Sequence, residues 1–68
     1  MSQTEINQRR AAAFSDLSSW FDVAPSDLRA TSVDGQLVVL LRIVGARARV
    51  AAGNVLGQHF PGALVQFD

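Results

Sequence analysis

The sequence lacks cysteine, lysine and tyrosine, and it has one histidine and one tryptophan in 68 residues. Without cysteine, the chain forms no disulfide of its own. One histidine and six scattered carboxylates form no cluster at metal-ligand spacing, so we expect neither a metal nor another cofactor. Small chains often gain stability from disulfides, metals or association. Self-association is therefore the reinforcement that we expect here.

Residues that could carry catalysis are equally scarce. The sequence has no G-x-S-x-G, no P-loop and no G-x-G-x-x-G. Asp22, Asp27 and Asp34 stand beside turn or cap signals, where a carboxylate has a local structural role. His59 follows an apolar helical pattern, and we interpret it as a satisfied, half-buried side chain. We therefore expect a protein that is not an enzyme.

The overall composition is that of a globular protein, with 49% apolar residues, 18% charged residues and a formal net charge of zero. A neutral chain is not expected to bind polyanions in general. Residues 1–68 are predicted to form one domain, whose stability is on the order of 3–10 kcal/mol. The start of the chain is polar, and the longest apolar run is far shorter than the ~20 residues of a membrane span. A cytoplasmic location is expected, with no membrane partner.

An amphipathic helix is predicted over residues 3–22. Ser2 and Glu5 have the spacing of a capping box at its start. Apolar residues then recur every three or four positions: Ile6, Ala13, Phe14, Leu17, Trp20 and Phe21. We interpret Trp20 and Phe21 as core anchors. Pro25 breaks the pattern, and Ser26 is a candidate cap for a single turn.

A β-hairpin is predicted around Asp34-Gly35, a pair typical of type I′ turns. This turn places Val33 opposite Gln36 and gives the rest of the register: Thr31 opposite Val38, Arg29 opposite Leu40 and Leu28 opposite Leu41. Residues directly opposite each other share a face. One face is then almost wholly apolar, with Leu28, Ala30, Ser32, Leu37, Val39, Leu41 and Ile43. The other face carries Arg29, Thr31, Val33, Gln36, Val38, Leu40, Arg42 and Val44.

Beyond Gly45, which is expected to end the second strand, a second helix is predicted. Its apolar positions are Val50, Val55, Leu56, His59 and Phe60. Gly53 and Gly57 weaken this helix, and we interpret them as points of close approach to the sheet. Pro61-Gly62 predicts a turn, followed by a short third strand over residues 63–67. The fold class is therefore α+β: one small domain in the order α-β-β-α-β, with a three-stranded sheet, an Asp-Gly hairpin and two helices packed on one face.

Two resemblances accompany this order of elements. From Val33 to Val65, "VDGQLVVLLRIVGAR…FPGALV" resembles the C-terminal iron–sulfur scaffold domain of the NifU type, in which a Gly-Ala-Cys-x-x-Cys loop precedes the helix. This chain has Arg47 and Val50 at the two thiol positions, so a relative of this kind holds no cluster there. In order and size, helix, "VDG" hairpin and helix are also similar to the lambda-type head–tail joining proteins of phages. That resemblance implies a subunit of an assembly.

The uncovered face of the sheet is the candidate interface. Its apolar centre is predicted to be Thr31, Val33, Val38 and Leu40, with Arg29, Gln36 and Arg42 as a polar rim. An apolar patch with a polar rim is typical of an interaction surface. We therefore expect a non-catalytic interaction module that forms a homodimer or, as an adaptor, docks onto a larger protein assembly.

An arginine patch gives the competing hypothesis. Residues 37–68 hold three arginines and one aspartate, whereas residues 1–36 hold three arginines and five acidic residues. Arg42, Arg47 and Arg49 could form a basic surface where the second helix begins, as in a small nucleic-acid-binding or regulatory protein. One observation argues against this hypothesis. Sheets that bind single-stranded nucleic acid stack its bases on exposed aromatic side chains, and the predicted open face has no aromatic side chain.

Overall fold

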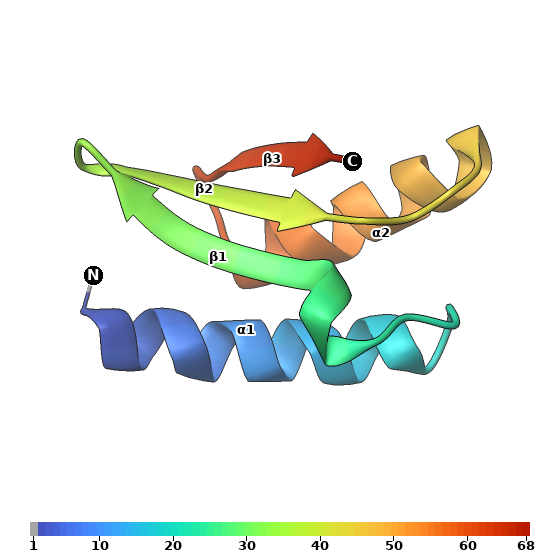
Figure 1. Ribbon diagram of the computed structural model, residues 1–68, viewed down its shortest axis with the longest axis horizontal. Helices are drawn as coiled ribbons and strands as arrows, with labels where there is room; N and C mark the ends of the chain where they lie inside the picture. The colour runs from blue at the N-terminus through green and yellow to red at the C-terminus, as the bar shows by residue number, and fades with distance from the viewer. Residues whose placement is uncertain (1) are drawn as a thin grey trace.

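A computed structural model describes residues 2–68 of the chain (Figure 1). It has two α-helices, one short 3₁₀ helix and a three-stranded mixed sheet. The elements are α1 (Gln3–Ser18), η1 (Pro25–Asp27), β1 (Leu28–Val33), β2 (Gln36–Leu41), α2 (Ala46–His59) and β3 (Leu64–Phe67). The predicted order α-β-β-α-β and the α+β class are therefore confirmed.

Helix α1 begins as the sequence predicts but ends four residues earlier. The Ser2 hydroxyl accepts a hydrogen bond from the Glu5 backbone N–H at 3.2 Å, which caps the first turn. At the other end, the hydroxyls of Ser18 and Ser19 donate to the carbonyls of Ser15 and Asp16. Such local bonds compete with the helical ladder. The helix therefore stops at Ser18, and the prediction of helix through residue 22 is wrong.

The turn after α1 is capped by an aspartate and not by the serine that the sequence suggested. The Asp27 carboxylate accepts a hydrogen bond from the Ala24 N–H at 2.9 Å across η1. Pro25 stands at the start of this turn, where its missing N–H costs nothing. The candidate cap Ser26 lies inside the turn, so that assignment is wrong.

The hairpin has the register that the sequence predicts. All four predicted pairs are present, from Val33 opposite Gln36 to Leu28 opposite Leu41. Asp34 has φ 51° and Gly35 has φ 79°, which are the two positive values of a type I′ turn. Since the register decides which side chains share a face, the assignment of the two hairpin faces is confirmed for residues 28–33 and 36–41.

Strand β2 ends at Leu41, before the predicted stop at Gly45. Leu41 is the last residue with partners on both sides, namely Leu28 on β1 and Phe67 on β3. Beyond it, the Arg42 N–H donates to the carbonyl of Asp27, outside the ladder. A strand continues only while it has a neighbour to pair with, so residues 42–44 are irregular.

Strand β3 adds parallel to β2, which gives the sheet order β1-β2-β3. The turn before β3 contains Pro61 and then Gly62 with φ 79°, as a type II turn requires. A Cβ atom at Gly53 would lie 3.7 Å from the Phe67 ring, so helix and strand do approach closely there. Gly57 has no atom within 4 Å of such a Cβ, and the same interpretation is wrong for Gly57.

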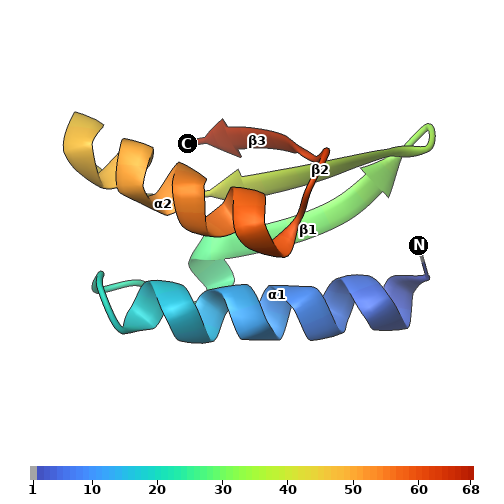
Figure 2. The same cartoon turned by 180° about the vertical axis from the view of Figure 1, so that it is seen from behind.

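The two helices lie on the same side of the sheet, and the other side is uncovered (Figure 1), as Figure 2 shows from behind. Between helices and sheet is the core, whose fully or nearly fully buried members are Ala13, Leu17, Leu28, Val39, Leu41, Ile43, Ala52, Leu56 and Phe60. Val50 was predicted on the apolar face of α2, yet it is 69% exposed. It lies two residues before Ala52, about 200° around the helix, so it points away from the core.

Candidate interaction surface

The uncovered face of the sheet carries a patch of side chains from all three strands. Thr31 and Val33 come from β1, Val38 and Leu40 from β2, and Leu64 from β3. Val33 is 51% exposed and Leu64 is 48% exposed, whereas Val38 and Leu40, on the central strand, are half-buried. Together these five residues form what we call the open-face patch.

Sequence analysis did not identify Leu64 as part of this patch. It belongs there because β3 pairs in parallel with β2 and sets Leu64 beside Val38. Neighbours in register share a face. Its only sequence signal is its place in a short strand after Pro61-Gly62, which says nothing about which edge of the hairpin receives that strand.

Polar residues surround the open-face patch. Arg29 and Arg42 are exposed at one end of the strands, and together with Ser26, Asp27, Leu40 and Asp68 they line a hollow of about 360 Å³. Near the other end, the Gln36 amide donates to the Gly62 carbonyl at 3.3 Å and ties β2 to the turn before β3. This arrangement of apolar centre and polar rim is typical of an interface.

The three arginines of the competing hypothesis have different environments. The Arg49 guanidinium donates from Nε to the carbonyl of Ile43 and from Nη2 to the carbonyl of Asp68, both at 3.1 Å. Arg49 therefore links the β2–α2 connection to the end of β3. Arg47 is exposed in the first turn of α2, and Arg42 is exposed at the rim of the open face. Arg42 and Arg47 therefore remain as candidate phosphate ligands, and Arg49 has a structural role.

The single histidine links the two helices. His59 Nε2 lies 2.7 Å from Asp16 Oδ2, across a contact between α2 and α1. His59 is half-buried, as expected, and this bond satisfies it. Among residues 2–68, no three His, Asp or Glu side chains come close enough together to hold a metal ion. Nor does any helix in this range have the length and apolarity needed to cross a membrane.

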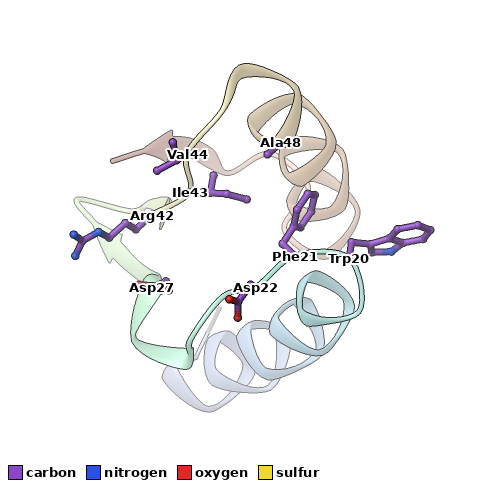
Figure 3. A pocket seen from close by; sticks show the side chains of 8 residues that line it. All are labelled: Trp20, Phe21, Asp22, Asp27, Arg42, Ile43, Val44 and Ala48. Atoms are coloured by element: carbon purple, nitrogen blue, oxygen red, sulfur yellow. The ribbon is translucent and has the colours of Figure 1, made fainter.

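A second exposed surface lies where α1 ends and α2 begins. Trp20, which the sequence predicts as a core anchor, is 76% exposed, and this prediction is wrong because the helix ends before it. Its neighbour Phe21 does pack against the core. Both line an open hollow of about 510 Å³, with Ile43 and Val44 on the opposite wall (Figure 3). Val44 is 90% exposed.

Comparison with known proteins adds no family to these observations. No family model, no curated protein and no solved structure matches this chain. The resemblances to the NifU-type domain and to phage joining proteins therefore stay at the level of motif fragments and element order. At the two thiol positions of the NifU-type pattern, Arg47 and Val50 are both exposed near the start of α2.

Proposed function

We propose that this protein is a small, non-catalytic interaction module that associates with a second copy of itself through the open-face patch. The observation that carries the proposal is that both helices lie on one face of the sheet, while apolar side chains from three strands remain accessible on the other. Sheets stack face to face at about 10 Å. The open face of one protomer can therefore stack on the same face of a second protomer.

The size of the face sets the expected strength of this contact. Three strands about 4.8 Å apart, with four to six residues rising about 3.3 Å each, give a face of roughly 250–290 Å². A stacked pair then buries roughly 500–600 Å² in total, below the ~1,200–2,000 Å² of stable complexes. The proposed dimer is therefore weak, and association must be followed up to high protein concentration.

Two other functions stay as alternatives. Docking onto a larger assembly, as a phage-type joining protein does, would use the same patch with a foreign partner. Nucleic-acid binding would use Arg42 and Arg47, but the five aromatic side chains of the chain all lie away from the open face. The face therefore offers no platform for stacked bases, and we favour self-association.

A matched pair of substitutions on β1 tests the proposal. Thr31 and Ser32 are adjacent, both are exposed, and their side chains point to opposite faces of the sheet. Thr31→Asp places a charge in the open-face patch, whereas Ser32→Asp places the same charge on the side of the helices. Both variants put the same side chain into the same strand, although Thr31→Asp also removes a β-branched residue that favours strands.

Sedimentation equilibrium gives the readout. We expect the mass of the parent chain and of Ser32→Asp to rise with concentration as the chains associate. Thr31→Asp lacks the sheet contact, so its assemblies should be smaller: a monomer where the parent is a dimer. If Thr31→Asp and Ser32→Asp have the same mass as the parent at every concentration, self-association through this face is refuted. A parent chain that stays monomeric at millimolar concentration also refutes it and leaves the patch to a foreign partner.

A further inference from the structure

Away from the sheet, the most exposed large apolar side chains gather at one end of the molecule. Trp20 follows α1, Val44 precedes α2, and Val50 lies in the second turn of α2. Three neighbouring hollows share lining residues and so link these side chains. The first is lined by Trp20 and Val44, and the second by Trp20 and Ala51. The third is lined by Ala51 and Val50. We call Trp20, Val44, Val50 and Ala51 the Trp20 surface.

On the Trp20 surface, the protruding side chain of Trp20 lies beside a hollow. In Figure 3, the indole of Trp20 points away from the body of the molecule. The adjoining hollow, between the end of α1 and the outer side of α2, has a volume of about 600 Å³, within the range of small-molecule sites. Trp20 itself forms part of its wall, together with the apolar residues Phe21, Ala51 and Val55.

The chemistry of this hollow fits an indole ring. An indole needs apolar and aromatic contacts for its faces and one acceptor for its N–H. Asn54 and Gln58 line the hollow and offer amide oxygens. Asp16 is the only ionisable group in the lining, and its Oδ2 already has a partner in His59 Nε2, 2.7 Å away.

We infer that the Trp20 surface binds a second copy of this chain by exchange of Trp20, each indole entering the hollow of the other protomer. Because the side chain and the hollow are adjacent on one surface, a single two-fold axis satisfies both at once. A tryptophan buries about 150–250 Å², so the exchange of two indoles buries roughly 300–500 Å² of tryptophan surface, and we expect this contact, like the sheet contact, to be weak.

This second contact leads to assemblies larger than a dimer. Trp20 and Arg42, a rim residue of the open face, point to opposite sides of the molecule (Figure 3). A protomer can therefore use the open-face patch and the Trp20 surface together, each with a different copy. Two such contacts build a closed tetramer or an open chain, depending on the angle between their axes.

Trp20 itself provides the readout, because it is the only tryptophan in the sequence. Its emission is measured across a concentration series together with the mass from sedimentation. We expect the emission maximum to move to shorter wavelength as association buries the indole. Ala51→Glu fills the hollow with a charged side chain and should abolish this shift. Ala11→Glu, the same change at an exposed site of α1 that lines none of these three hollows, is the control.

The outcomes separate this inference from the proposed sheet contact. If Thr31→Asp lowers the mass and keeps the emission shift, both contacts exist. If only Ala51→Glu lowers the mass, the sheet contact is wrong and the Trp20 contact stands. Emission that stays constant while mass rises, or a shift that Ala51→Glu leaves intact, overturns the Trp20 contact. Should Ala51→Glu lose helix by circular dichroism, Asn54→Arg at the exposed rim replaces it.

Discussion

Replacing glycine by alanine should have opposite effects at two positions of this chain. At both Gly35 and Gly57, an added Cβ would meet no atom within 4 Å. The difference is in the backbone, because Gly35 has φ 79° in the hairpin turn, whereas Gly57 lies within α2. Contacts therefore cannot explain a difference between the two variants, and only the backbone conformation can.

The magnitudes follow from that conformation. A left-handed backbone costs an L-residue about 1–2 kcal/mol, so Gly35→Ala should lower the free energy of unfolding by that amount. Gly57→Ala should raise it by about 0.5–1 kcal/mol, because alanine loses less entropy in a helix. At 4–8 °C per kcal/mol for a domain of this size, the shifts in Tm are about −4 to −16 °C and about +2 to +8 °C.

Far-UV circular dichroism during thermal unfolding is the appropriate assay. Trp20 emission is a poor monitor of unfolding, since the side chain is already 76% exposed in the folded protein. All variants must be compared at one concentration, because association makes Tm concentration-dependent. If Gly35→Ala melts within a degree of the parent or above it, the turn is misplaced. The face assignment of the hairpin would then fall with it.

Two further predictions concern the arginines. Arg49→Gln should lower the free energy of unfolding by about 1–2 kcal/mol through loss of its two bonds to carbonyls, whereas Arg47→Gln should stay within about 0.5 kcal/mol of the parent. Urea denaturation measures both, and equal effects would contradict the structural role of Arg49. If the chain binds nucleic acid, its affinity should fall steeply with salt, and Arg47→Gln should reduce the log–log slope by about 1. Absence of binding to DNA and RNA at low salt would eliminate that function.

Local signals were sufficient to predict the hairpin and the order of the elements. Asp34-Gly35 fixes the turn type, the turn type fixes the register, and the register assigns every hairpin side chain to a face. The start of α1 was equally predictable, because Ser2 and Glu5 interact across a single turn. These features depend on residues close together in the chain, so the amino-acid order determines them.

The ends of helix α1 and strand β2 depend on which hydrogen-bonding partners are within reach. The periodicity of apolar residues along the sequence does not show this. The apolar pattern continues through Trp20 and Phe21, yet two serine hydroxyls end α1 at Ser18 and leave the indole in solvent. The second strand has β-forming residues as far as Val44, but it stops where its neighbours stop. In both cases the sequence pattern extends further than the hydrogen-bonding partners do.

What the sequence determined by itself was the set of elements and the two faces of the hairpin, because turn chemistry and side-chain alternation act over a few residues. Only the tertiary structure decided which edge received β3, and with it that Leu64 joins Val38 on the open face. It also brought Trp20 next to α2, although Ala51 is 31 positions further along the chain. Contacts between such distant residues are set by the packing of helices on the sheet, and no local pattern encodes them.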